Sequence, residues 1–151
     1  MADGPSIRIR QLDAYKFEID FGEAFPGLRV DEAEPIGAGT GPFPEQILIA
    51  SVTNCLCASF VFASGKFKQD VRGIEAEARA RIERNGEGRL RIAGIEVAIA
   101  LGAPAEAMPR IDRVLAQFER FCTVSESVKA GIPVTVAVRD GTGTLLTEAA
   151  A

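Results

Sequence analysis

The chain contains no histidine. This absence excludes catalytic sites that pair a serine or a cysteine with a histidine base, and it leaves few ways to build a zinc site. The chain also lacks an excess of positive charge, because its net charge is −4. An acidic chain argues against nucleic acid as a partner and against an electrostatic membrane anchor.

Cysteine is scarce, with three residues in 151, and no basic segment followed by an apolar run precedes them. The absence of such a leader predicts a cytoplasmic protein. In a reducing compartment a permanent disulfide scaffold is not expected, so three cysteines predict free thiols.

The length and composition predict one domain, residues 1–151, with a sizeable core. Alternation of apolar and polar residues predicts six strands, near residues 7–10, 15–21, 28–30, 74–83, 90–101 and 133–139. Three helices are predicted, at 44–66, from 104 or 109 to 122, and from 123 to 131. Strands joined by tight turns predict an α+β fold. The tail, residues 141–151, is expected to be loosely tied.

Local signals predict three details of these elements. Asn85-Gly86 marks a hairpin turn, and the apolar phase slips by one residue at Ala93-Gly94, as a β-bulge would require. Thr123-Val124-Ser125-Glu126 fits a capping box at the start of a short helix.

The predicted helix 44–66 is apolar on nearly every side from Ile47 to Ala63. Its apolar run is shorter than a usual membrane span and carries Asn54 near its centre, so we interpret it as a buried core helix. One chain with a single other long helix could hardly cover it on all sides, and a homodimer would bury the remainder.

Each cysteine has a structural and a chemical interpretation. Cys55 lies within the apolar helix, where free cysteine is often inert packing, but an activated thiol there would be a nucleophile. Cys57 points to a different side of the helix and is interpreted as packing. Cys122 ends an apolar stripe, and it is either packing or a resolving thiol. Glu45 either stabilises the helix by its interaction with the positive end of the macrodipole or helps to activate Cys55.

Three segments together resemble a known family: Gly41-Pro42-Phe43-Pro44-Glu45-Gln46 leading to Cys55, Phe121-Cys122-Thr123-Val124-Ser125, and Gly131-Ile132-Pro133-Val134. The chain resembles the OsmC/Ohr family of osmotically inducible and organic hydroperoxide resistance proteins, from about Ile7 to Arg139. The loop at residues 31–35 resembles a less characterised, OsmC-like branch. The resemblance implies an OsmC-like fold, with antiparallel sheets around a long buried central helix, in an intertwined homodimer.

The resemblance also implies roles for individual residues. Cys55 would be the peroxidatic thiol, Cys122 the resolving thiol, and Glu45 the acid that pairs with an arginine to stabilise the thiolate. Family members carry that arginine near the position of Asp13, Ala14 and Tyr15, none of which is basic here. Three other basic residues are candidates to replace it: Arg10, Lys16 and Arg29.

The function predicted on this basis is a thiol-dependent peroxidase. Its substrates would be small organic hydroperoxides, its reductant an external thiol or dithiol, and it would need no metal, flavin or haem. The alternative is a non-catalytic OsmC-like module that binds a small apolar or thiol-bearing ligand, which the missing arginine favours.

Overall fold

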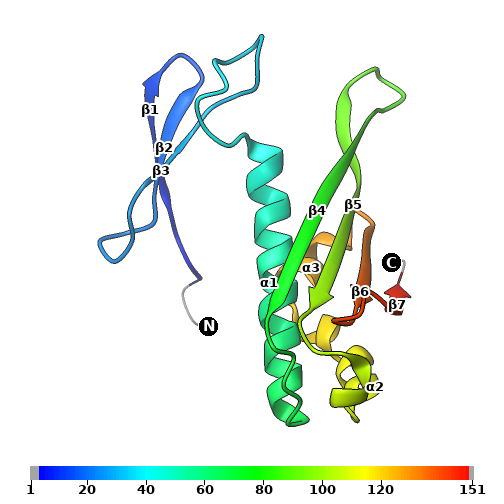
Figure 1. Cartoon of the computed structure of the whole chain (residues 1–151). Coiled ribbons are helices and arrows are strands. Elements are labelled where there is room, and N and C mark those ends of the chain that lie inside the picture. The colour runs from blue at the N-terminus through cyan, green and yellow to red at the C-terminus, as the bar shows by residue number, and fades with distance from the viewer. Residues whose placement is uncertain (1–3, 150–151) are drawn as a thin grey trace. The chain divides into compact units, whose positions relative to one another are not determined.

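The computed structural model describes residues 4–149, and the chain divides into two compact units within its longest helix. The first unit ends at Ile47 and the second begins at Leu48. Figure 1 labels their elements, and each unit is described by itself.

The N-terminal unit is a three-stranded antiparallel sheet. Its strands are β1 (Arg8–Asp13), β2 (Lys16–Asp20) and β3 (Leu28–Val30), in the order β1-β2-β3. All three strands predicted from alternation are therefore confirmed. Ala14 closes the first hairpin with a φ of 42°, a left-handed conformation that few residues other than glycine adopt.

A loop organised by one buried carboxylate joins β3 to the long helix. Asp31 is only 3% exposed and accepts hydrogen bonds from the backbone of Glu32, from that of Ala38, and from both the backbone and hydroxyl of Thr40. The hydrogen bonds, led by that of the Thr40 backbone, lower the pKa of Asp31. Gly37 closes the loop tightly, because a Cβ there would lie 2.3 Å from the carbonyl oxygen of Glu32.

Helix α1 (Pro44–Lys66) begins at Pro44, as the sequence predicts. It is long and apolar enough to cross a membrane by length and composition, but a core helix of a soluble protein has the same features. One side of the helix lies in the core, as predicted, and a single chain leaves another side uncovered, which is also expected from its all-round apolar composition. One third of its most apolar 18-residue window is buried, while Val61 and Phe62 are 57% and 61% exposed.

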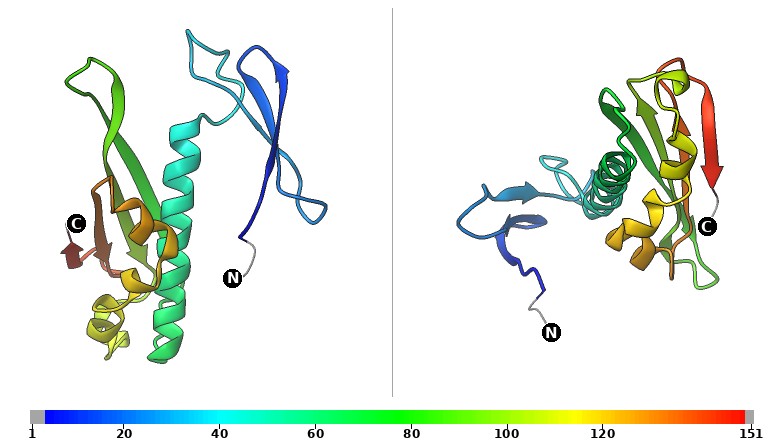
Figure 2. Two further views of the ribbon diagram at one scale, coloured as in Figure 1. Left: turned by 180° about the vertical axis from the view of Figure 1, so that it is seen from behind. Right: turned by 90° about the horizontal axis from the view of Figure 1, so that it is seen from below.

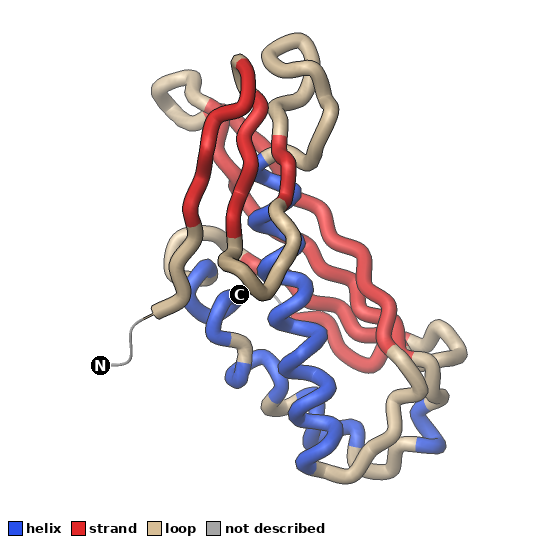
Figure 3. Tube along the Cα trace, turned by 90° about the vertical axis from the view of Figure 1, so that its left-hand side faces the viewer, coloured by secondary structure: helices blue, strands red, loops and turns tan. Residues whose placement is uncertain are grey.

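The second unit is built on a four-stranded sheet of β4 (Ile74–Arg84), β5 (Leu90–Leu101), β6 (Val134–Arg139) and β7 (Leu145–Ala149), in that order. Helix α1 and the shorter helices lie on one face of this sheet (Figures 2 and 3). Between them is the core, which includes Val52, Leu56 and Phe60 of α1, Ile95, Val97 and Ile99 of β5, and Val134, Val136 and Val138 of β6.

The long β4–β5 hairpin contains the predicted bulge. Arg81 pairs with Gly94 and Ile82 pairs with Ile92, which leaves Ala93 as the extra residue. The predicted turn also lies at Asn85, but it extends to residue 89. The side-chain oxygen of Asn85 accepts the N–H groups of Glu87 and Arg89, which stabilises this wider turn.

Strand pairing corrects two predictions. The sheets are antiparallel except that β6 runs parallel to β5, because the helical segment between them crosses over one face of the sheet. Residues 145–149, expected in a loose tail, form β7 and pair with β6. Residues 150 and 151 lie outside the described part of the chain.

The helix predicted from 104 or 109 to 122 is divided into three pieces. They are η1 (Ala105–Ala107), α2 (Ile111–Leu115) and η2 (Phe118–Phe121), and they precede α3 (Thr123–Val128). Pro109 lacks an N–H group and cannot donate a helical hydrogen bond. The segments that flank α2 are 3-10 helices, in which each N–H bonds the carbonyl three residues earlier, as that of Arg120 bonds the carbonyl of Gln117. The predicted apolar face survives this division in part, because Ile111, Val114, Phe118 and Cys122 are buried, whereas Phe121 is 39% exposed.

A second buried carboxylate joins distant segments of this unit. Asp140 is 4% exposed and accepts hydrogen bonds from the backbone of Ala105, from the backbone and hydroxyl of Thr142, and from the backbone of Thr144. These bonds, above all that of the Thr142 hydroxyl, lower the pKa of Asp140 to about 2. The ionised carboxylate therefore ties the start of η1 to the β6–β7 connection.

We expect Asp140→Asn to lower the free energy of unfolding at neutral pH. A carboxyl group with a depressed pKa stabilises the fold above its unfolded pKa of about 3.9, and this contribution is lost as the pH falls towards about 2. Urea denaturation measures the free energy of unfolding of the unmutated protein and of Asp140→Asn. The difference between the two values should be largest at neutral pH and should decrease as the pH falls through this range.

Asp112→Asn is the matched control, because Asp112 is exposed and its side chain accepts no hydrogen bond among residues 4–149. If the loss of unfolding free energy in Asp140→Asn is the same from neutral to acid pH, the stabilisation does not come from the ionised carboxylate of Asp140.

Candidate active site at two cysteines

Cys55 lies near the middle of α1, on the side where the helix passes from the core to the surface. Its side chain is half-buried and packs against the edge of the core, one residue before the fully buried Leu56. A half-buried sulfur combines some access for a small molecule with partial shielding from water. Reactive cysteines in proteins share this partial exposure, and they also need an electropositive neighbour.

Cys122 is fully buried, and aromatic residues hold its segment against α1. The rings of Phe60 and Phe118 pack in the core with their centroids 4.8 Å apart, and the rings of Phe62 and Phe121 meet edge to face at 5.0 Å. Lys66 adds a cation–π contact, with its Nζ 5.4 Å from the centre of the Phe121 ring. Residues 118–121 are therefore fixed on α1 directly before Cys122.

The structure brings Cys55 and Cys122 together, although 67 positions separate them in the chain. Burial raises the pKa of Cys122, and a hydrogen bond with the thiol of Cys55 raises it further, as does the charge on Cys55 when that thiol ionises. Both cysteines are free. The packing of η2 on α1 explains how these two distant residues come near one another.

The sulfur of Cys122 also caps helix α3. It accepts the N–H of Ser125 at 3.3 Å, so the N-cap residue is Cys122 rather than Thr123. The predicted capping box is thus shifted by one residue, since the cysteine sulfur supplies the acceptor that a threonine hydroxyl was expected to supply.

Sequence analysis missed Ser125 as a member of this site. Ser125 is fully buried, and its hydroxyl has no regular hydrogen-bond partner among residues 4–149. It nevertheless lies close enough to the sulfur of Cys122 to lower the pKa of that thiol. Its position three residues after a cysteine at a helix start is the signal that could have identified it.

Glu45 lies in the first turn of α1 and is half-buried. Within residues 4–149 of a single chain its carboxylate forms no ion pair or hydrogen bond. Ten residues of a regular helix span about 15 Å, which is too far for direct contact between Glu45 and Cys55.

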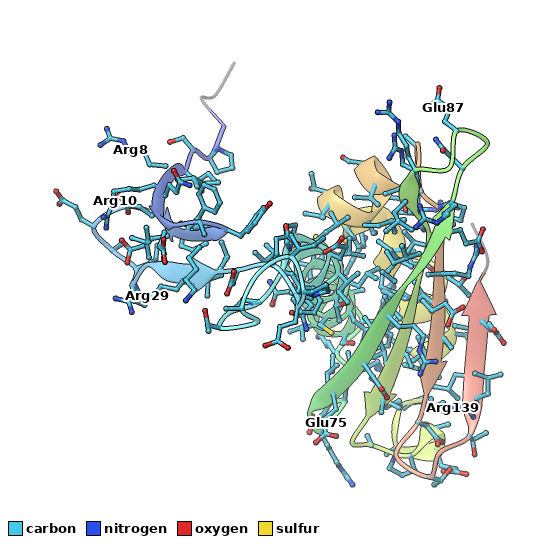
Figure 4. The ribbon with its side chains drawn as sticks, turned by 90° about the horizontal axis from the view of Figure 1, so that it is seen from above. Arg8, Arg10, Arg29, Glu75, Glu87 and Arg139 are labelled. Carbon is cyan, nitrogen blue, oxygen red and sulfur yellow. The ribbon has the colours of Figure 1, made fainter. Side chains whose placement is uncertain are left out.

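The basic residues considered as replacements for the missing arginine all belong to the N-terminal strands. Arg10 is bound to Glu18 at 2.5 Å, and Lys16 and Arg29 form no ion pair within residues 4–149. Figure 4 labels Arg10 and Arg29, and both side chains are exposed on this unit. The groups that act on the pKa of Cys122 include no basic side chain.

Cys57 is half-buried, and burial raises the pKa of its thiol. No neighbouring group opposes this effect, so the thiol of Cys57 stays protonated at neutral pH. This agrees with its interpretation as a packing residue.

The hollow on the opposite face of the four-stranded sheet is a different kind of surface. It is lined by charged and small side chains, which include Glu77, Arg79, Glu96, Thr135 and Glu148. It contains no cysteine, and alternating charges on an exposed sheet face are explained by solvation. In residues 4–149, no group of three Cys, Asp or Glu side chains is arranged to hold a metal ion.

Solved structures with this architecture are similar to the chain over nearly its whole length. A putative osmotic stress induced and detoxification response protein from Psychrobacter arcticus has a TM-score of 0.74 at 15% identity, covering 92% of this chain and 98% of that one. An OsmC-like protein of unknown function from Vibrio cholerae reaches 0.76 at 11% identity, with 91% and 99% covered. A putative organic hydroperoxide resistance protein from the same species, with captopril in one of its active sites, reaches 0.72 at 18% identity, with 97% of each chain covered.

These identities are low, so the structural similarity establishes the fold alone. No curated protein matches the sequence. The family of OsmC-like proteins, however, matches residues 37–137, a segment that contains α1, Cys55 and Cys122, the strands β4 and β5, and the first part of β6. The chain therefore belongs to the OsmC-like protein family, and the resemblance seen in its motifs is confirmed.

Proposed function

We propose that the protein is a thiol-dependent peroxidase that reduces organic hydroperoxides through Cys55 and Cys122. The observation that carries this proposal is that two thiols, one half-buried and one fully buried, lie at the same core, close enough for Cys55 to raise the pKa of Cys122. Membership of the OsmC-like family and the fold shared with organic hydroperoxide resistance proteins support a role in peroxide stress.

The two-cysteine chemistry balances without a cofactor. The thiolate of Cys55 attacks one peroxide oxygen, the O–O bond breaks, and the alcohol leaves after it takes up a proton. Cys55 is then a sulfenic acid. The sulfur of Cys122 attacks the sulfur of Cys55 to form a disulfide, and the hydroxyl leaves as water with the proton of Cys122. An external thiol or dithiol reduces the disulfide.

Burial decides which cysteine meets the peroxide. Cys122 is fully buried and could not contact a substrate without local opening, whereas Cys55 is half-buried. The effects that raise the pKa of Cys122 keep its proton in place while Cys55 is a thiolate. Cys55 is therefore assigned as the peroxidatic thiol and Cys122 as the resolving thiol.

Exposed aromatic surface beside the thiols favours organic peroxides over hydrogen peroxide. Phe62 follows Cys55 by seven residues on the same side of α1, and Phe121 precedes Cys122. An alkyl group gains free energy from contact with such a surface, at about 25 cal/mol for each Å² removed from water.

A partly buried thiolate also requires a cation to offset its desolvation. We assign to Glu45 the role of holding this cation, which comes from the N-terminal strands of the same subunit or of a partner. A homodimer is part of this proposal, because the exposed apolar side of α1, with Val61 and Phe62, requires a cover.

The second candidate is a module that binds a small ligand and turns over no peroxide. The lack of a basic residue at Asp13–Tyr15 favours it. The captopril in an active site of the Vibrio cholerae protein favours it too, because captopril is a small molecule with a thiol. This candidate requires that Cys55 remain protonated and unreactive at neutral pH.

We expect Cys55→Ser to reduce the consumption of an organic hydroperoxide, with a dithiol as reductant, to the uncatalysed rate. Cys57→Ser is the matched control and should keep most of the activity, since burial keeps the Cys57 thiol neutral. The rate is followed by peroxide loss in a coupled or direct assay.

The unmutated protein also decides between the two candidates. If its Cys55 is reduced by thiol assay and it still consumes no organic hydroperoxide above the uncatalysed rate, the peroxidase function is wrong and ligand binding is favoured.

Mild oxidation of the unmutated protein should join Cys55 to Cys122 within one chain. Cys55 lies near enough to act on the pKa of Cys122 in the reduced protein, and a disulfide requires that their Cα atoms come within about 7 Å. Peptide mapping without reduction detects the bond. A Cys55–Cys57 bond, or over-oxidised Cys55 without any disulfide, would remove Cys122 from the mechanism.

The protein should sediment at twice its chain mass of 16.1 kDa at micromolar concentration. A matched pair of variants locates the interface: Phe62→Glu on the exposed side of α1 should weaken the dimer, and Glu77→Lys on the opposite face of the sheet should not. An unmutated protein that is monomeric would contradict this assembly.

A further inference from the structure

The hydroxyl of Ser125 is a buried polar group without an ordinary partner. It is one of two such side-chain atoms in residues 4–149, the other being the hydroxyl of Ser64. Leaving a buried hydroxyl without a hydrogen bond costs about 1–3 kcal/mol, so such a group calls for an explanation. The neighbour of Ser125 is the sulfur of Cys122, which already accepts the backbone N–H of the same serine at 3.3 Å.

We propose that Ser125 is a positioning residue for the resolving step: its N–H donates a hydrogen bond to the sulfur of Cys122, and its buried, otherwise unpartnered hydroxyl turns to donate a second one when that sulfur becomes a thiolate for attack on oxidised Cys55. This inference rests on the proposed function. It assigns to one residue, three positions after the predicted site residue Cys122, the task of making a fully buried thiol reactive.

The balance of effects on Cys122 changes during the reaction. In the reduced protein, burial and Cys55 raise the pKa of Cys122, and the two groups of Ser125 lower it. After oxidation, Cys55 is a neutral sulfenic acid, so its negative charge no longer opposes ionisation of Cys122. Burial then stands against Ser125 alone, and Cys122 loses its proton more readily when its electron pair is needed.

Among the described residues, no charged side chain stabilises the thiolate of Cys122 in place of Ser125. Cys55 on α1 is the titratable side chain that acts on Cys122. The nearby charges of η2 and α3 are engaged with one another, because Lys129 binds Glu119 at 2.6 Å and Glu126 at 3.0 Å. The sheet contributes aliphatic side chains to the core around this point, such as Val97 and Val136.

The proton and electrons balance in this step. The thiolate of Cys122 supplies the electron pair of the new S–S bond, and the S–O bond of Cys55 breaks. The departing hydroxide takes up the proton that Cys122 gave up, so water leaves. Ser125 keeps its proton throughout and forms no covalent bond, which distinguishes it from a catalytic acid or base.

Two measurements test the proposal with Ser125→Ala. In the first, one equivalent of an organic hydroperoxide oxidises the reduced protein, and a sulfenic-acid trap and non-reducing peptide mapping follow Cys55. We expect the first oxidation to keep its rate. Disulfide formation at neutral pH should slow about tenfold, with its pH profile displaced upwards by about one unit, because a hydrogen bond to a charged group is lost.

The second measurement is independent of peroxidase activity. In Cys55→Ala/Cys57→Ala protein, Cys122 is the single thiol, and its ionisation is followed by thiolate absorbance. Adding Ser125→Ala should raise the measured pKa of Cys122 by about one unit. If this titration is unchanged, the proposal is wrong even where peroxide reduction is observed. If the titration shifts but no peroxide is reduced, the proposed function fails and the interaction of Ser125 with Cys122 stands.

Ser64→Ala is the matched control, because it also deletes a buried hydroxyl without a regular partner, but one that does not act on any cysteine. It should leave both measurements unchanged. Ser125→Thr retains the hydroxyl and should restore the pH profile. If Ser64→Ala displaces the profile as far as Ser125→Ala does, the effect is general loosening of the core, and the proposal is overturned.

Discussion

The docking of residues 118–122 on α1 is the contact on which the candidate site depends. The Phe60–Phe118 pair is fully buried, and such a pair stabilises the docked state by about 0.5–1.5 kcal/mol beyond the area it removes from water. The Phe62–Phe121 pair is more exposed and adds less, but it fixes the rotation of the segment. Because the segment closes with three-residue hydrogen bonds, its end is short and tightly turned. The sulfur of Cys122 is thereby held beside Cys55.

Burial and hydrogen bonding compete at this pair of thiols, and the competition gives the two sulfurs different properties. Full burial favours the protonated form of Cys122, so this thiol is protected until another group makes ionisation favourable. The cap of α3 provides that group within the same turn of chain, since a cysteine at the N-cap receives the N–H of the third helical residue. A threonine at this position would cap the helix equally well but could form no disulfide. The helix start therefore caps α3 and also holds the thiol that the proposed chemistry requires.

Much of the fold could be predicted from periodicity, because strands such as β4 to β6 and helix α1 obey simple patterns over many residues. The bulge at Ala93 was also visible, since a slip in alternation has a single geometric cause. The division of residues 105–121 could not be predicted. Its apolar spacing fits one continuous helix, and the break depends on Pro109 and on long-range packing of Phe118. Strand β7 was missed because its pairing with β6 is not encoded in local alternation. Cys55 and Cys122 were singled out through motifs. Ser125 lies in the same motif as Cys122 but was missed, because the sequence does not reveal that its hydroxyl is buried without a partner.

The proposed two-cysteine chemistry has two physical requirements, and they are separable in this molecule. Disulfide formation needs two sulfurs within reach and a route to ionise the second, and one chain supplies residues for both in α1, η2 and α3. Activation of the first sulfur needs a cation, and the groups that act on the pKa of Cys122 within one chain include no basic side chain. A chain in this family can therefore keep the geometry for oxidation to a disulfide while the strength of its peroxide chemistry depends on a cation supplied from elsewhere. Since a cation changes the rate at which Cys55 reacts and Ser125 changes the fate of the oxidised product, the two effects would alter different steps. Slow peroxide consumption followed by rapid disulfide formation would indicate that no cation stabilises the Cys55 thiolate well. Rapid peroxide consumption with a persistent sulfenic acid would indicate that the attack by Cys122 is slow.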